Sequence, residues 1–219
     1  MPLIRYQDKI VLFVHIPKTG GTSVEDALKE AGATVALRYG SRFKGFMKST
    51  FQHLTAEIHE AVIPHNFYDD AFALVRHPVP RLLSAYRYRH KRGDSPMPFD
   101  DWVNKAFDAY GRNPYAFDNH IRPQVDFLLS DMTLFRLEEG LDLALQHAEV
   151  KLGLPRSVVA VHRNKTAQKA PVKVSAATWD RVLKFYAADF ARLGYDSEEK
   201  FADIKTSLLR RWRQFLPGA

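Results

Sequence analysis

Short apolar runs alternate along the chain with longer segments in which apolar residues recur at helical spacing. The run at residues 10–16 is compact and rich in β-branched residues, which is typical of a strand buried in a parallel sheet. Residues 24–31 instead follow a helical pattern that stops at Gly32. We predict strands at 10–16, 71–75, 132–137 and 157–161, and helices at 24–31, 55–62, 79–89, 99–110, 138–152, 178–193 and 198–215.

This alternation predicts the fold class. It favours an α/β protein with a parallel sheet covered by helices on both faces. The order of strand, glycine turn and helix near the start of the chain indicates a P-loop-like arrangement. The polar stretches between the elements mark no domain boundary, so we expect one domain spanning residues 1–219.

The loop after the predicted strand 10–16 is the first candidate site. Its paired glycines let the backbone approach an anion closely, and the following helix offers unpaired N–H groups and a positive dipole end. The loop is not a Walker A motif, because Lys18 precedes both glycines instead of following the second. An ordinary strand–helix turn is the alternative. The predicted phosphate ligands are Lys18, Thr19, Gly20, Gly21, Thr22 and Ser23.

Arg76 is a second candidate phosphate ligand, because it follows the predicted strand 71–75 at the edge where parallel α/β sheets bind ligands. Ser84 lies one to two turns into the next predicted helix, so the guanidinium and the hydroxyl can converge on one phosphate. A surface arginine at a helix start is the alternative. No aspartate for magnesium follows this strand, so we predict that a nucleotide is bound without a dedicated metal.

Together these segments resemble the motifs of sulfotransferases that depend on 3′-phosphoadenosine 5′-phosphosulfate (PAPS), especially the branch that includes the carbohydrate 2-O-sulfotransferases. In that family a loop like 18–23 binds the 5′-phosphosulfate. The resemblance implies that Arg76 and Ser84 bind the 3′-phosphate, and that Lys165 and Thr166 belong to a loop that closes over PAPS. The residues that match the 3′-phosphate motif are Arg76, Pro78, Arg81, Ser84 and Tyr86.

The same resemblance makes His53 the candidate general base, because the 2-O-sulfotransferase branch has a base histidine at about this distance before the 3′-phosphate arginine. Sulfuryl transfer needs a group that accepts the proton of the attacking hydroxyl, and a neutral imidazole with a pKa of about 6.5 suits that role. Glu57 and Glu60 on the next predicted helix are the alternative bases. His120 lies in a family-like segment that we expect near the acceptor.

Composition narrows the chemistry further. The chain has 219 residues, no cysteine and a net charge of +7, which excludes disulfides and cysteine nucleophiles and favours anionic partners. No apolar run is long enough to cross a membrane, and no zinc-ligand spacing occurs. The lack of cysteine fits a reducing compartment, so we expect a cytoplasmic location. The chain is short beside Golgi-type family members and lacks their membrane anchor, so it is more similar to a compact bacterial member.

Two basic segments have several interpretations. Segment 87–92 interleaves tyrosine with basic residues, as expected for a nucleic-acid contact, a solvated helix end or a contact to an anionic acceptor. Segment 210–215 could touch a membrane or a partner, and a helix that packs Trp212 and Phe215 inward is the alternative.

We therefore expect transfer of a sulfuryl group from PAPS to a hydroxyl, on a saccharide acceptor, by in-line displacement at sulfur. His53 accepts the acceptor proton, and Lys18 stabilises the developing charge. No metal and no nucleic-acid partner are expected. The alternatives are a P-loop kinase-like phosphotransferase and a non-catalytic protein that binds nucleotides or nucleic acid.

Overall fold

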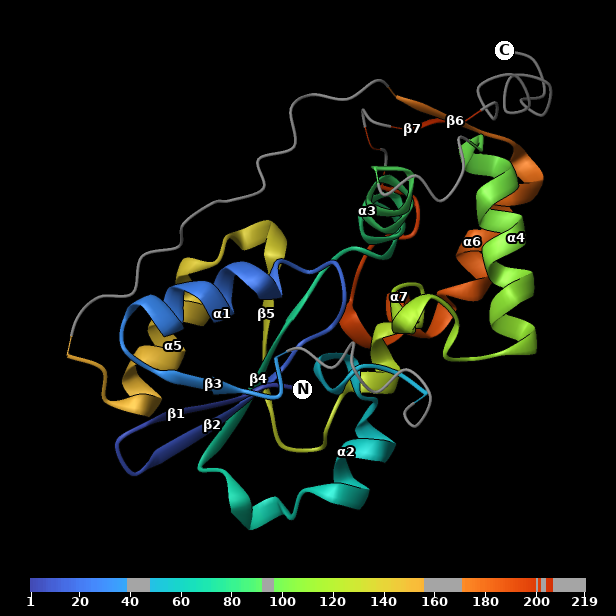
Figure 1. The fold of residues 1–219 in the computed structure, drawn as a ribbon. Helices are drawn as coiled ribbons and strands as arrows, with labels where there is room; N and C mark the ends of the chain where they lie inside the picture. The colour runs from blue at the N-terminus through green and yellow to red at the C-terminus, as the bar shows by residue number, and fades with distance from the viewer. Residues whose placement is uncertain (39–47, 92–96, 156–170, 200, 202–203, 207–219) are drawn as a thin grey trace.

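The central sheet combines parallel and antiparallel strands. The computed structural model describes residues 1–38, 48–91, 97–155, 171–199, 201 and 204–206. Within them the sheet has the order β3-β1-β2-β4-β5 (Figure 1). β2, β4 and β5 pair in parallel as predicted, whereas β1 is antiparallel to both β2 and β3. The strands are β1 (Leu3–Tyr6), β2 (Lys9–Val14), β3 (Thr34–Ala36), β4 (Asp70–Val75) and β5 (Thr133–Arg136).

The sheet is therefore mixed and not wholly parallel. The sequence pattern does not predict β1 and β3, because both are short and lie at one side of the sheet where few of their residues are buried. β1 turns directly into β2 through Gln7, which has a φ of 52°. This tight antiparallel connection places Ile4 opposite Val11 in the register.

The helices follow the predicted order with two interruptions. The helix expected at 138–152 begins only at Asp142, because Gly140 with a φ of 96° ends a preceding short turn. The helix expected at 178–193 divides at Tyr186, whose buried hydroxyl donates to the carbonyl of Ile121 at 2.7 Å. The α-helices in the described residues are α1 (Gly21–Glu30), α2 (Ala56–Val62), α3 (Pro78–Lys91), α4 (Phe99–Arg112), α5 (Asp142–Leu152), α6 (Ala176–Phe185) and α7 (Ala187–Leu193). None of these is both long and apolar enough to cross a membrane.

The predicted helix 198–215 is wrong where the structure describes it. Residues Ile204–Thr206 form β7, which pairs in parallel with β6 (Val172–Val174). The two strands satisfy each other's backbone groups, and Ile204 is buried against the helices. The rest of that segment from 207 onward, and the predicted strand 157–161, lie outside the described residues.

Apolar side chains cover both faces of the sheet, as predicted. Because side chains alternate along a strand, Phe13 and Phe72 pack against α1 and α5, whereas Val14 and Ala73 face the opposite side. Phe127 and residues of α2 and α7 complete that second side. α3, α4, α6 and α7 form a further helical cluster with an aromatic interior (Figure 1).

The register of the sheet brings two connections together. Val14 of β2 lies opposite Ala73 of the parallel strand β4, so both strands end at the same edge. The loop from β2 to α1 and the loop from β4 to α3 therefore start side by side. This edge, at the carboxyl ends of parallel strands, is where open α/β sheets form their ligand sites.

Candidate active site

The loop between β2 and α1 has a strained backbone that only part of its sequence favours. Lys18 has a φ of 72° and Gly20 a φ of 92°, both in the left-handed region. The hydroxyl of Thr19 donates to the carbonyl of Ile16 at 2.8 Å and stabilises the turn. A Cβ on Gly21 would lie 2.8 Å from the ring of His15, so this position has no room for a side chain.

The N-terminus of α1 is open to an anion. Gly20 occupies the capping position, and no side chain there accepts from the first N–H groups of the helix. These groups, together with the positive end of the helix dipole, make a binding site for phosphate or sulfate. A Cβ on Gly20 would lie 3.0 Å from the side chain of Leu137, so both glycines let the loop pack closely against neighbouring side chains.

Arg76 and Arg81 hold this loop from the neighbouring connection. Arg76 follows β4 and donates from Nη1 to the carbonyl of Lys18 at 3.3 Å. Arg81 on α3 is fully buried and donates from Nε to the carbonyl of Pro17 at 2.9 Å. Its Nη2 also donates to the carbonyl of Arg122 at 2.7 Å. Arg81 therefore ties two loops to the start of α3, a structural role that the sequence motif does not reveal.

Positive charge accumulates at this edge of the sheet. Burial and the neighbouring charge of Arg76 lower the pKa of Lys18 to about 8. Burial also lowers the pKa of Arg76; Glu138 opposes this, and the charges of Arg81 and Arg87 add to it. Cations that disfavour one another in this way are stabilised by a bound anion. The donor set therefore fits the phosphate and sulfate groups of PAPS.

His53 is buried beside a carboxylate. It ends a short turn, Phe51–His53, and its Nδ1 lies 2.8 Å from Oδ2 of Asp118. Thr50 donates to the same carboxylate, from its backbone N–H at 2.7 Å to Oδ1 and from its hydroxyl at 3.0 Å to Oδ2. The side-chain amide of Asn119 donates to the carbonyl of His53 at 2.8 Å. The sequence analysis missed Asp118, which no local motif identifies.

The pKa values of both residues are lowered, which keeps His53 neutral and Asp118 ionised. Burial lowers the pKa of His53 to about 4, although the hydrogen bond to Asp118 opposes that shift. For Asp118, burial favours the neutral acid, but the contacts with His53 and Thr50 outweigh it and lower the pKa to about 2. At neutral pH the pair is therefore a neutral imidazole and an ionised carboxylate.

Aromatic contacts connect His53 to Lys18. The ring of His53 lies 5.1 Å from that of His120 and 5.2 Å from that of His15, both edge to face. His120 stacks at 5.3 Å on Tyr88 of α3, and Nζ of Lys18 lies 4.1 Å from the centre of the Tyr88 ring. The residues predicted for anion binding and for proton transfer therefore lie in one continuous cluster.

His15 is a second histidine that the sequence analysis gave no role of its own. It follows β2 directly, and its Nδ1 contacts the buried carboxylate of Glu25 on α1. Gln52 donates to both oxygens of Glu25 at 2.9 and 3.0 Å, and Nε of Arg38 donates to Glu25 at 2.8 Å. This network fixes His15 below the start of α1. The position of His15, just before the predicted loop 18–23, is the sequence signal that could have identified it.

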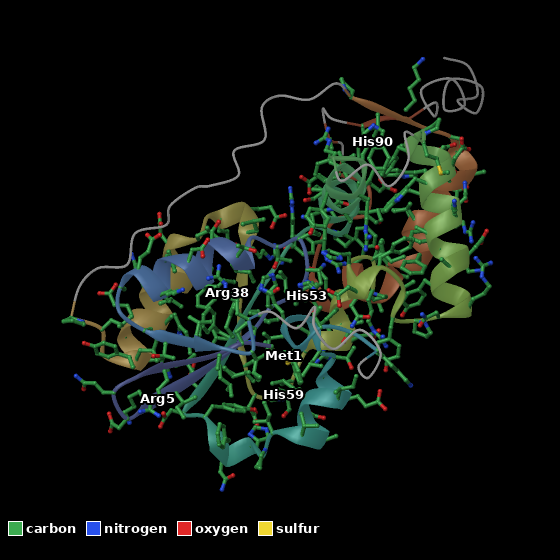
Figure 2. All side chains as sticks on the ribbon, in the orientation of Figure 1. Met1, Arg5, Arg38, His53, His59 and His90 are labelled. Carbon is green, nitrogen blue, oxygen red and sulfur yellow. The ribbon has the colours of Figure 1, made fainter. Side chains whose placement is uncertain are left out.

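Other predicted residues lie apart from this cluster or are not described. Glu57 and Glu60 are exposed on α2, whereas His53 is buried. Figure 2 shows His90 near the outer end of α3 and His59 on α2, both away from His53. Ser84 is half-buried on α3, and its role as a phosphate ligand stays a prediction. Lys165 and Thr166 lie outside the described residues. Among the described residues, no group of histidine and acidic side chains could hold a metal ion.

Comparison with known proteins identifies the family. The model of the sulfotransferase family matches residues 2–196, which is most of the chain, and the chain belongs to that family. No curated protein matches it significantly. A sulfotransferase structure from Alicyclobacillus acidocaldarius aligns with 18% identity and a TM-score of 0.39 over 69% of this chain and 60% of that chain. The chain thus spans less than two thirds of that protein's length. At this TM-score the likeness defines neither fold nor site, so the assignment rests on the family match.

Proposed function

We propose that this member of the sulfotransferase family transfers a sulfuryl group from PAPS to a hydroxyl of a saccharide in the cytoplasm. One observation carries the proposal: the contacts Lys18–Tyr88–His120–His53 join the cationic edge of the sheet to a buried histidine that is paired with a half-buried carboxylate. An anion site alone would fit a nucleotide-binding protein. A neutral imidazole next to it adds the group that an attacking hydroxyl requires.

The loop residues 18–23 and the start of α1 would bind the 5′-phosphosulfate, with Arg76 and Ser84 at the 3′-phosphate and Lys165 and Thr166 closing over the nucleotide. PAPS supplies the activated sulfuryl group. The uncapped N–H groups at the start of α1 support this assignment, because no side chain at the capping position Gly20 accepts from them. The charge of Arg76, half-buried beside the Lys18 carbonyl, supports a multiply charged ligand.

His53 would act as the general base through Nε2, the ring nitrogen that does not contact Asp118. A pKa of about 4 keeps the imidazole neutral at pH 7, so that it is ready to accept the hydroxyl proton. The carboxylate of Asp118 would stabilise the imidazolium that forms. Lys18 would stabilise negative charge on the transferring group and on the leaving phosphate as the bond to sulfur breaks.

Segment 87–89 supports an anionic acceptor. Tyr88 contacts Lys18, Arg87 acts on the pKa of Arg76, and the guanidinium of Arg89 lies 5.1 Å from the ring centre of Phe117. This part of α3 therefore borders the candidate site and is not only a solvated helix end. An acceptor that already carries carboxylate or sulfate groups would be attracted to it.

The donor assignment is tested by nucleotide binding. Wild type should bind adenosine 3′,5′-bisphosphate at least about tenfold more tightly than adenosine 5′-phosphate, because a charged hydrogen bond contributes about 1.5–3 kcal/mol. Arg76→Ala should abolish that preference, whereas Arg112→Ala, exposed on α4, should keep it. Isothermal titration measures both constants. Equal binding of the two nucleotides by wild type would contradict the assignment.

The reaction is tested with labelled PAPS and a panel of glycans, lipids and phenols. We expect label transfer to a saccharide that survives a chelator and is lost in His53→Ala, with His90→Gln as the exposed histidine control. Loss in Glu57→Gln or Glu60→Gln but not in His53→Ala would assign the base to a carboxylate. Thermal stabilisation by ATP with magnesium, or by RNA, in place of the bisphosphate would favour a phosphotransferase or a nucleic-acid-binding protein.

A further inference from the structure

We propose that Asp118 is a positioning residue that holds His53 in the tautomer with hydrogen on Nδ1 and a bare Nε2. The proposal rests on the proposed role of His53 as base, and it concerns which nitrogen of the ring is able to accept a proton. It assigns a function to a residue outside the phosphate motifs.

The hydrogen bonds around Asp118 determine the direction of the contact with His53. An ionised carboxylate can only accept, so the 2.8 Å contact requires a hydrogen on Nδ1 of His53. Both carboxylate oxygens are also held by Thr50, through its backbone N–H at 2.7 Å and its hydroxyl at 3.0 Å. The carboxylate cannot rotate away without losing these bonds as well.

The ring of His53 is also restrained on its other sides. His15 and His120 contact it edge to face, and Asn119 fixes the backbone carbonyl of His53. A ring flip would put Cδ2 in the place of Nδ1, would lose the contact with Asp118 and would have to displace these neighbours. His120 has its own fixed orientation, because its Nδ1–H donates to the carbonyl of Phe117.

Asp118 sits in an unusual backbone with three consecutive left-handed residues. Phe117, Asp118 and Asn119 have φ values of 58°, 54° and 61°; aspartate and asparagine tolerate this region, whereas Phe117 is strained in it. The turn is retained by the bonds from Asn119 to His53 and from Arg81 to the carbonyl of Arg122. Strain of this kind that is held at a candidate site is consistent with a functional requirement.

Asp118→Asn tests the proposal because it keeps the shape of the side chain and replaces one acceptor oxygen with an amide group that donates. The asparagine oxygen should remain opposite the Thr50 N–H, which can only donate, and its amide would then face Nδ1 of His53. The amide donates, so Nδ1 would have to be bare and Nε2 would carry the hydrogen. The base would then be unable to accept the hydroxyl proton, although every heavy atom stays in place.

Long-range nitrogen–hydrogen NMR correlations of ¹⁵N-histidine-labelled protein at pH 7 report the tautomer, with the His53 signals assigned from their loss in His53→Gln. We expect Nδ1–H in wild type and in the exposed control Asp101→Asn, and Nε2–H in Asp118→Asn. Thr50→Val removes the hydroxyl contacts to Asp118 at 3.0 Å and to Nδ1 of His53 at 3.3 Å, and should keep Nδ1–H because the carboxylate still accepts from it. Nε2–H in wild type or in Thr50→Val, or Nδ1–H in Asp118→Asn, would overturn the proposal.

Turnover provides the functional readout. Asp118→Asn should lower the rate of labelled transfer at least about 100-fold, since general base catalysis contributes about 10²–10⁴. Its affinity for adenosine 3′,5′-bisphosphate should stay within about twofold of wild type, because Asp118 contacts no residue of the anion loop. Full turnover in Asp118→Asn with an active His53 would overturn the proposal. Full turnover in His53→Gln would instead remove the proposed base, while the NMR result on Asp118 would still stand.

Discussion

Burial shifts the pKa values of several ionisable side chains at the candidate site. Lys18 and Arg76 are close enough to repel each other, and both have a lowered pKa, with burial as the larger cause. His53 and Asp118 form the opposite case, because their hydrogen bond stabilises the ionised carboxylate next to a neutral ring. Perturbed ionisable groups of this kind concentrate at functional sites.

Lys18→Ala should separate catalysis from binding. If Lys18 stabilises charge that develops during transfer, its loss should reduce turnover by about 10²–10³, as for other groups of this type. Affinity for the product nucleotide should change much less, because the backbone N–H groups and Arg76 remain. Steady-state rates beside isothermal titration measure the two effects. Turnover near that of wild type would rule out the catalytic role.

His53 should make the protein less stable in acid. Its pKa is about 4 in the fold against 6.5 in an unfolded chain, so the unfolded chain binds more protons between these values. The free energy of unfolding should therefore fall as pH drops from 6.5 to 4, by about 3 kcal/mol from this group. Denaturant titrations at several pH values should show a smaller fall in His53→Gln and an unchanged one in His90→Gln. Equal falls in wild type and His53→Gln would contradict the shift.

At the scale of elements, two strand–helix connections build the anion site. The loop from β2 places Gly20 and Gly21 at the start of α1, and the loop from β4 brings Arg76 against the carbonyl of Lys18. Arg81 from the first turn of α3 then fixes the β2 loop from below through Pro17. Neither connection forms the site without the other.

Gly21→Ala tests the tight packing at the start of α1. The added methyl would lie 2.8 Å from the His15 ring, which is itself held by Glu25, so the contact cannot relax easily. Overpacking of this kind costs about 1–3 kcal/mol of stability, and we expect weaker binding of the product nucleotide as well. Gly111→Ala in α4 has nothing within 4 Å and should be neutral or stabilising. Denaturation and nucleotide titration of both variants make the comparison, and equal effects would argue against a packed loop.

At the scale of the whole molecule, the candidate site lies where the sheet meets the helical cluster. β2 and β4 supply the anion loops, α3 supplies Tyr88, and the 116–119 turn supplies Asp118. Figure 2 shows His53 near this junction. The basic part of α3 thus extends from the site toward solvent, where an acceptor would approach.

An anionic acceptor should make the reaction salt-dependent. Charges separated by about 10 Å are screened at 0.1 M salt. Higher salt should therefore raise the KM for a charged saccharide and leave the KM for a neutral saccharide unchanged. The double variant Arg87→Ala/Arg89→Ala should raise KM for the charged saccharide at low salt. Lys105→Ala/Arg112→Ala removes two exposed charges from α4 as a matched control. If both double variants handle charged acceptors like wild type, the segment has no acceptor role, and a preference for small phenols would remove the saccharide assignment.

The elements that could be predicted from the sequence are those whose signals are local. The apolar run of β2, the paired glycines and the start of α1 follow one another directly, so composition and spacing predict the loop. β4, Arg76 and α3 are predictable for the same reason, and their order implies parallel pairing. The resemblance selected His53 among nine histidines, and its catalytic role stays a prediction.

The folded chain brings together residues that no local pattern connects. Asp118 lies 65 residues from His53 in sequence, on a left-handed turn in which Phe117 is disfavoured. Residues 204–206 follow a helical pattern yet form β7, because β6 offers them backbone partners, and the helix after Ala176 breaks where the Tyr186 hydroxyl reaches Ile121. In each case long-range hydrogen bonds decide the conformation, because a buried polar group without a partner costs about 1–3 kcal/mol.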